Sequence, residues 1–233
     1  KKLKKKSNIK LIHIVAPSVW AWRTYRAKKF AKIFDELLVL YSFETKYFTK
    51  HNLKTTLIGH PIYYIQSTIP FKLVNINIAF LPGSRMSEVK RLLPYFTLAY
   101  KYILKELPNS NIFFPTLPHL EEYIQKYVSN WKIKVIITTN LSQINDIYRN
   151  TSHALVCSGT ASLEIAKRNI PQLVIYKFNI ITELILKMFV NVKYANIFNI
   201  IVNKMIIPEV TNSNLTPYNF IKEGDKLIKS KND

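Results

Sequence analysis

The sequence predicts an α/β fold in which two parallel sheets, each covered by helices, are joined by a short linker. Along most of the 233 residues, apolar and often β-branched runs alternate with segments of helical period. The strand-like runs are almost continuously apolar, which is typical of parallel strands buried on both faces. Residues 62 to 74 break the alternation and contain Pro70. We therefore expect a linker there, and two α/β layers that face a cleft.

The first block, residues 1 to 61, begins with a β-branched run that ends at Pro17. Apolar residues then recur at i, i+3, i+4 and i+7, from Ala27 to Phe34, and mark one face of a helix. Gly59 and Pro61 stop the last strand. The expected elements are a strand at 9–17, a helix around 27–34, a strand at 36–41, a short helix at 42–52 and a strand at 55–61.

The second block, residues 75 to 233, repeats the alternation more often. Pro94 interrupts its first helix, where it is expected to split the helix or start a new turn. Thr216 as N-cap and Pro217 at the first position mark the start of the last helix. The expected strands are 76–84, 111–117, 132–139, 153–159 and 171–177, and the expected helices are 87–106, 120–128, 141–150, 160–169 and 218–229.

The chain is strongly basic. Its 34 Lys and Arg residues against 14 Asp and Glu give a net charge of +20, which attracts nucleotides, phospholipid headgroups or nucleic acid. Many lysines stand among asparagines and isoleucines, so a genome-wide compositional bias accounts equally well for part of the excess. No nucleic-acid recognition motif accompanies the charge, and we expect no nucleic-acid partner.

Cysteine and hydropathy narrow the class of protein further. Cys157 is the only cysteine, which excludes a disulfide framework and a cysteine metal cluster and fits a reducing cytoplasm. No His, Cys, Asp and Glu grouping has metal-ligand spacing, so neither a metal nor another cofactor is expected. Uncharged apolar stretches stay below the ~18 residues that cross a bilayer. The chain does not start with Met, and we expect it to begin in the middle of a longer protein.

Ligands of an open parallel sheet bind beyond the carboxyl ends of the strands, so the turns there are the candidate sites. In "LPGSRMSE", Gly83 and Ser84 follow a strand and lead to Arg85. Glycine lets a ligand approach the backbone, the helix N-terminus attracts anions, and the guanidinium fork suits phosphate. An ordinary turn with a solvated Arg explains this pattern as well.

The segment "CSGTASLE" repeats the design after a later strand. Ser158, Gly159 and Thr160 place backbone N–H groups at a helix start, which is again an anion site. Glu164 lies about one helical turn further on, and its carboxylate can accept from two vicinal hydroxyls, such as those of a ribose. The alternative is an ordinary Glu that stabilises the helix dipole.

Aromatic and histidine residues follow the first-block strands. Trp20, Trp22 and Arg23 lie just past the first strand, where the tryptophans either pack in a core or stack on a sugar or acyl chain. His13 lies inside a strand, and we expect it to be packed. His60, in "GHP", is expected to order the hinge.

Taken in order and spacing, these motifs resemble the lipid-A-disaccharide synthase family. The resemblance rests on "IHIVAPSVWAWR", "GHP", "LPGSRMSEVKRLLP", "CSGTASLEIA", "PQLVIYK" and "NIFNIIVN" followed by "IIPE", and spans about residues 9 to 223. It implies a GT-B-like fold of two Rossmann-like domains, the first only partly present. It also implies a glycosyltransferase that joins UDP-2,3-diacylglucosamine to 2,3-diacylglucosamine 1-phosphate and releases UDP, in the cytoplasm and peripheral to the inner membrane of a Gram-negative bacterium.

The resemblance assigns roles by position. Arg85, in the turn with Gly83 and Ser84, matches the family's phosphate-contacting arginine. Glu164 matches the acidic residue expected at the ribose, and Asn199 matches an asparagine needed for activity. Here Asn199 lacks the preceding proline of the family's Leu-Pro-Asn context, and "PEVTNSN" stands where the family has a glutamine after "PEL". The pyrophosphate loop corresponds to Ser158, Gly159 and Thr160.

The family's N-terminal segment, with its Gly-rich acceptor loop, membrane-touching patches and the aspartate considered the general base, has no counterpart in this sequence. We therefore expect residues 1–61 to be the second half of the acceptor-side domain, 75–233 to be the donor-binding domain, and the chain by itself to form no disaccharide. The alternatives are a catalytically inactive UDP-sugar-binding remnant and a basic membrane-surface or nucleic-acid-binding module. The expected partners are the two acyl-sugar substrates and an anionic membrane; the oligomeric state, a homodimer included, stays open.

Overall fold

The computed structural model describes residues 9–20, 24–65, 76–177 and 194–229. Contacts divide the described residues into two compact units, one ending at Tyr64 and the other beginning at Ile65. Residues 66–74 of the predicted linker, together with Trp22 and Arg23, lie outside the described residues. The assignment of two domains separated by that linker therefore stays a prediction.

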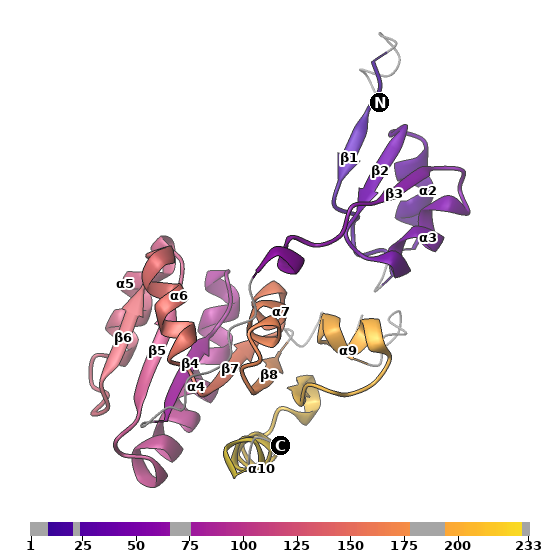
Figure 1. Cartoon of the computed structure of the whole chain (residues 1–233). Helices are drawn as coiled ribbons and strands as arrows, with labels where there is room; N and C mark the ends of the chain where they lie inside the picture. The colour runs from indigo at the N-terminus through magenta and orange to yellow at the C-terminus, as the bar shows by residue number, and fades with distance from the viewer. Residues whose placement is uncertain (1–8, 21–23, 66–75, 178–193, 230–233) are drawn as a thin grey trace. The chain divides into compact units, whose positions relative to one another are not determined.

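The first unit contains a small parallel sheet with the strand order β1-β2-β3 (Figure 1). Buried Ala27, Leu37, Val39 and Phe48 form its core against the helices. The predicted helix at 42–52 is a 3₁₀ turn followed by a short α-helix. The elements are β1 (Ile12–Ile14), α2 (Tyr25–Ala31), β2 (Glu36–Val39), η1 (Ser42–Glu44), α3 (Thr45–Thr49), β3 (Lys54–Leu57) and η2 (Pro61–Tyr64).

The second unit is built on a six-stranded sheet, with every described pair of neighbouring strands parallel. The strands are β4 (Asn77–Leu81), β5 (Asn111–Pro115), β6 (Val135–Thr138), β7 (His153–Cys157), β8 (Gln172–Tyr176) and β9 (Glu209–Thr211). The helices are α4 (Met86–Glu106), α5 (Pro118–Val128), α6 (Leu141–Arg149), α7 (Thr160–Lys167), α9 (Ile197–Val202) and α10 (Pro217–Lys229), and η3 (Asn212–Asn214) is a 3₁₀ turn. The order β6-β5-β4-β7-β8-β9 places the topological switch between β4 and β7 (Figure 1).

Both faces of this sheet are buried, as the apolar strand sequences predicted. Along β4, Ile78 and Phe80 belong to a core cluster with α4, α5 and α10, and the alternate residues Ala79 and Leu81 belong to a second cluster with α6 and α7. Side chains alternate between the faces of a strand, so one continuous apolar run supplies two cores. This pattern confirms the predicted class of parallel, doubly covered sheet.

One expectation in this unit was wrong, and two short elements were missed. Helix α4 continues through Pro94 instead of splitting. The proline is exposed and its neighbours Leu92, Leu93 and Phe96 are fully buried, so packing against the sheet holds the helix while solvent can satisfy the freed carbonyl. The short elements α9 and β9 were not predicted. The start of α10 is as predicted, because Pro217 is its first residue and the Thr216 hydroxyl accepts from the Asn219 amide.

Candidate functional site

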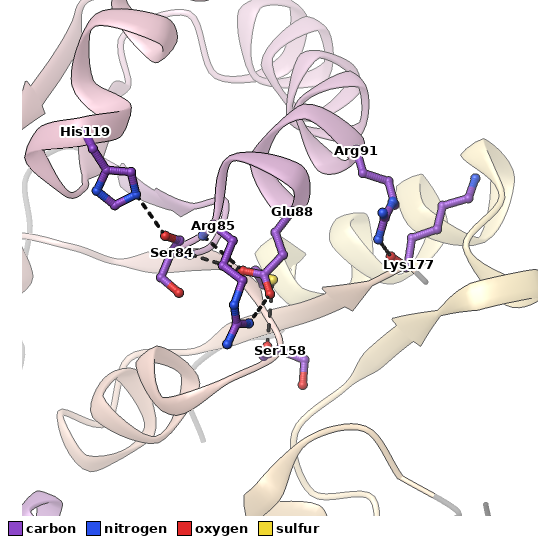
Figure 2. Close-up of polar contacts among 8 residues, drawn as sticks. Ser84, Arg85, Glu88, Arg91, His119, Ser158 and Lys177 are labelled. Carbon is purple, nitrogen blue, oxygen red and sulfur yellow. Dashed lines mark hydrogen bonds and ion pairs between the residues drawn. The ribbon is translucent and has the colours of Figure 1, made fainter. Parts of the chain in front are cut away.

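The two glycine turns singled out in the sequence lie side by side at the switch point. The turn of Gly83, Ser84 and Arg85 follows β4, and the turn of Ser158, Gly159 and Thr160 follows β7 (Figure 2). Strands β4 and β7 are paired in register, with Leu81 opposite Val156, so their carboxyl ends emerge together. Ligands of open parallel sheets bind at this place.

The Gly83 turn is closed by a carboxylate that the sequence analysis did not single out. Gly83 has φ +115°, and a Cβ on it would lie 2.8 Å from Glu88 Oε2 and 3.3 Å from Cys157 Sγ. Glu88 Oε2 accepts from the Ser84 and Arg85 amides, each at 3.3 Å. The Ser84 carbonyl accepts from His119 Nε2 at 3.2 Å (Figure 2). The backbone groups of this turn are thus engaged within the protein.

Arg85 extends from this turn into solvent. Its side chain is 75% exposed, while its partner Glu88 is 12% exposed. One guanidinium nitrogen, Nη1, donates to Glu88 Oε1 at 2.7 Å, and this bond raises the pKa of Arg85. The remaining guanidinium donors have no partner among the described residues and can contact an anion, while the phosphate-binding role of Arg85 stays a prediction.

Cys157 is buried and lies close to the Gly83 turn. Burial, followed by the Glu88 charge, raises the pKa of its thiol, the Arg85 charge lowers it, and the result is a pKa of about 12. The thiolate is the nucleophile in cysteine chemistry, and it is not formed near neutral pH at such a value. Cys157 therefore has a packing role.

The Gly159 turn is open. Ser158 is engaged, since its amide donates to the Ile175 carbonyl at 3.0 Å and its hydroxyl to the Ala195 carbonyl at 2.8 Å. Within the described residues, the Gly159 and Thr160 amides at the start of α7 have no acceptor. A Cβ on Gly159 would meet no atom of the described residues within 4 Å, chain neighbours aside. This turn therefore combines amide donors that have no acceptor in the described part of the chain with a helix N-terminus, which suits an anion.

Glu164 lies one turn into α7, where the sequence placed it. Its Oε1 accepts from Arg168 at 3.2 Å, with exposed side-chain fractions of 30% for Glu164 and 8% for Arg168. Arg168 also donates to Asn145 and lies over the Tyr148 ring at 4.9 Å. The carboxylate thus has an intrahelical partner and retains an exposed part that can accept from a ligand.

Asn199 is fully buried in α9 and uses its amide to hold the following loop. Its Oδ1 accepts from the Ile206 and Ile207 amides, both at 3.0 Å, and its Nδ2 donates to the Ile207 carbonyl at 2.7 Å. These contacts give Asn199 a positioning role and leave its predicted part in the reaction a prediction.

A network around Glu209 ties α9 to the Gly159 turn. Glu209 accepts from the Ala195 amide at 2.9 Å and the Asn196 amide at 2.7 Å, and Asn196 bonds to Ser162 of α7. The "IIPE" motif was noted in the sequence, but without this role for Glu209.

The sequence signal that could have identified Glu88 is the capping box, in which a Glu at the third helical position bonds back to the N-cap backbone.

The first-unit residues also have structural partners. His13 packs on Phe30 and Phe34, as expected for a packed histidine. His60 Nδ1 accepts from the Ile62 amide, and its ring stacks on Tyr41, which orders the chain after β3. Trp20 packs edge-on against Phe43.

Two further properties concern the described residues as a set. No helix among them combines the length and apolarity needed to cross a bilayer. They also contain no group of three or more His, Cys, Asp or Glu side chains placed to hold a metal ion.

Solved structures similar to this chain share its fold. TarM matches with a TM-score of 0.54 at 12% identity, over 88% of this chain and 38% of that one. MurG from Acinetobacter baumannii matches with a TM-score of 0.50 at 13% identity, over 95% and 59%. These likenesses support the predicted GT-B-like α/β class.

Sequence comparisons identify the family. The family model described as lipid-A-disaccharide synthetase matches residues 1–232. The lipid-A-disaccharide synthase of Rhodospirillum centenum is 32% identical over 94% of this chain and 57% of its own length, and that of Rickettsia prowazekii 38% over 87% and 55%. The chain thus spans somewhat more than half the length of these curated relatives. By its sequence, the chain belongs to the lipid-A-disaccharide synthase family.

Proposed function

We propose that this chain supplies the donor-binding part of a lipid-A-disaccharide synthase. The reaction joins UDP-2,3-diacylglucosamine to 2,3-diacylglucosamine 1-phosphate to give the disaccharide 1-phosphate and UDP. The observation that carries the proposal is the pair of turns at the switch point (Figure 2): one has an exposed Arg85, and the Gly159 and Thr160 amides of the other have no acceptor among the described residues. In this scheme residues 75–233 form the donor domain and residues 1–61 part of the acceptor-side domain.

In this proposal, both turns bind the diphosphate of UDP, and Glu164 of α7 binds the ribose. The Gly159 and Thr160 amides and the Arg85 guanidinium bind the diphosphate, and Glu164 accepts from the ribose hydroxyls. When the acceptor hydroxyl attacks the anomeric carbon, the bond to the diphosphate breaks and negative charge grows on the leaving oxygen. Prepositioned donors stabilise that charge more than they stabilise the bound substrate. Asn199 contributes by positioning the loop after α9.

The general base lies outside these assignments. Two acidic residues of the first unit, Asp35 and Glu44, are candidates for the base, but both have structural partners. Asp35 accepts from the Leu11 amide at 2.9 Å, and buried Glu44 accepts from the Tyr41 amide at 3.2 Å. We therefore propose that neither of them serves as the general base, and that this chain alone forms no disaccharide.

The alternative within the family is a UDP-sugar-binding remnant that performs no transfer. Calorimetric titration of the chain with UDP tests binding, and addition of a separately expressed N-terminal half from a relative tests transfer. Binding with restored transfer supports the enzyme, while binding without transfer supports the remnant. No UDP binding by the folded chain would contradict both.

We further propose that the protein acts on the cytoplasmic face of the inner membrane, where its acyl-sugar substrates lie. The net charge of +20 attracts anionic lipid, and this attraction is screened beyond a Debye length of ~8 Å at physiological salt. Co-sedimentation with anionic vesicles should therefore fall as salt rises. Equal sedimentation at low and high salt would rule out an electrostatic origin, and sedimentation velocity in the same buffers tests for a homodimer.

A further inference from the structure

The site contains a largely buried carboxylate, Glu88, to which the proposed function assigns no role. Glu88 lies on the first turn of α4, with its side chain only 12% exposed. Its carboxylate accepts hydrogen bonds from the Ser84 amide, the Arg85 amide and one guanidinium nitrogen of Arg85 (Figure 2). A single anionic side chain thus engages both the backbone and the charged tip of the turn.

This arrangement limits what the turn can offer a ligand. The Ser84 and Arg85 amides already donate to Glu88 Oε2, so a phosphate cannot use them while that carboxylate is in place. The Ser84 carbonyl is also engaged, by His119. The Arg85 guanidinium remains exposed to solvent, and its Nη1 contacts Glu88. Arg85 is therefore the charged group through which the turn can act on an anionic ligand.

A solvent-exposed arginine has many rotamers, and fixing it on a phosphate has an entropic cost. The Glu88 contact reduces that cost beforehand, because it holds one edge of the guanidinium from below and leaves the other donors directed outward. The negative charge of Glu88 repels an incoming anion. This repulsion is limited because the ion pair with Arg85 neutralises the Glu88 charge.

We propose that Glu88 is a positioning residue for phosphate recognition, acting through the Arg85 guanidinium. This inference rests on the proposed function, since it takes the diphosphate of UDP as the ligand of Arg85. It predicts that loss of the Glu88 charge weakens binding of the phosphates and leaves recognition of the nucleoside unchanged. A residue that only stabilised the fold would not separate the two.

The test is calorimetric titration of the whole chain with UDP and with uridine. Glu88→Gln keeps an oxygen that can accept from the two amides and loses the ion pair with Arg85. We expect UDP affinity to fall roughly tenfold, equivalent to about 1.4 kcal/mol, with uridine affinity unchanged. In an Arg85→Ala background, the same Glu88→Gln change should have no further effect.

Two more variants complete the experiment. Glu122→Gln removes the same charge from an exposed position on α5 and should leave both affinities unchanged. Glu88→Asp keeps an acceptor near the amides but is one methylene shorter, so it should repeat the loss of UDP affinity even if Glu88→Gln does not fold.

The outcomes are distinct. UDP binding that Glu88→Gln and Glu88→Asp leave unchanged or strengthen would overturn the inference and leave the proposed function intact. Equal losses for UDP and uridine would also overturn it, because they indicate a purely structural role. Failure of the unaltered, folded chain to bind UDP would overturn the proposed function, and the inference with it.

Discussion

The two turns at the switch point share a sequence design and differ in what fills them. Both follow a parallel strand, contain a glycine and lead into a helix. The Gly83 turn is filled by the chain's own carboxylate, Glu88, which engages its amides. The Gly159 turn has no such partner among the described residues, and a Cβ added at Gly159 would contact none of their atoms within 4 Å, its chain neighbours aside. A glycine and a helix start therefore do not by themselves identify an anion site.

The difference follows from the side chain that comes next. In the first turn a Glu three residues into the helix returns to the N-cap backbone, whereas in the second the residues after Gly159 are Thr160, Ala161 and Ser162. The first turn becomes a rigid support for Arg85, and the second leaves its amides to a ligand. The two glycines consequently serve different purposes: Gly83 avoids a clash inside the protein, and Gly159 keeps a space clear outside it.

The largest expected effect concerns the support behind the open turn. Asn199→Ala leaves the Ile206 and Ile207 amides and the Ile207 carbonyl without their partner. We expect the free energy of unfolding to fall by roughly 2–5 kcal/mol, since the Ile207 amide and carbonyl are buried and each buried unpaired group costs about 1–3 kcal/mol. Urea denaturation measures this. A stability within error of the unaltered chain would show that the loop after α9 does not depend on Asn199.

The next prediction contrasts the two glycines directly. Gly83→Ala should lower the free energy of unfolding by roughly 2–4 kcal/mol, because the residue would keep a positive φ and its Cβ would press on Glu88. Gly159→Ala, the matched control, should leave stability nearly unchanged. Denaturation of both variants provides the measurement, and equal losses at the two positions would remove the distinction between a filled and an open turn.

Glu164→Gln should weaken UDP binding by roughly 1.5–3 kcal/mol, the range for a hydrogen bond to a charged group. From the sequence alone we would expect the melting temperature to stay nearly unchanged. The ion pair with Arg168 alters that expectation, since the variant also weakens an internal contact and should melt somewhat lower. Titration with UDP lacking the 2′- and 3′-hydroxyls separates the effects: the affinity difference should vanish for that ligand if Glu164 binds the ribose.

The smallest expected effect is at Cys157, between the turns. Burial raises the pKa of its thiol to about 12, so alkylation by iodoacetamide at pH 8 should be much slower in the folded chain than in urea. Because the folded pKa lies above the unfolded one, the associated stability is present below pH ~9 and is lost as the pH rises toward about 12. Rapid alkylation of the folded chain at pH 8 would indicate that the turns open.

Much of the fold was predictable because its signals are local. After a polar first residue, the strands Asn77–Leu81 and His153–Cys157 are apolar, and a glycine two residues beyond each marks the strand end. The strand order was not stated from the sequence, because pairing between β4 and β7 depends on residues more than 70 positions apart. The short elements α9 and β9 were missed because six and three residues carry too little periodicity.

The residue types of the candidate site could be predicted from the sequence, but many of the contacts that these residues make could not. Gly83, Arg85, Gly159 and Thr160 meet at one edge of the sheet, as expected for turns at strand ends. The engagement of Ser84 and Ser158 by internal partners was not visible, because it depends on where Glu88, His119 and the Ala195 carbonyl lie in space. Pro94 shows the same limit, since tertiary packing overrides a local helix-breaking signal.

The most direct test of the account is the affinity of Gly159→Ala for UDP. Among the described residues, chain neighbours aside, the added methyl group has no atom within 4 Å, so the fold should persist, and it belongs to the turn that we propose binds the diphosphate. If the open turn binds the diphosphate at close range, calorimetric titration should show UDP affinity reduced by about tenfold or more, equivalent to at least about 1.4 kcal/mol, at an unchanged melting temperature. An unaltered UDP affinity in the folded variant would contradict the claim that the Gly159 turn is the diphosphate site.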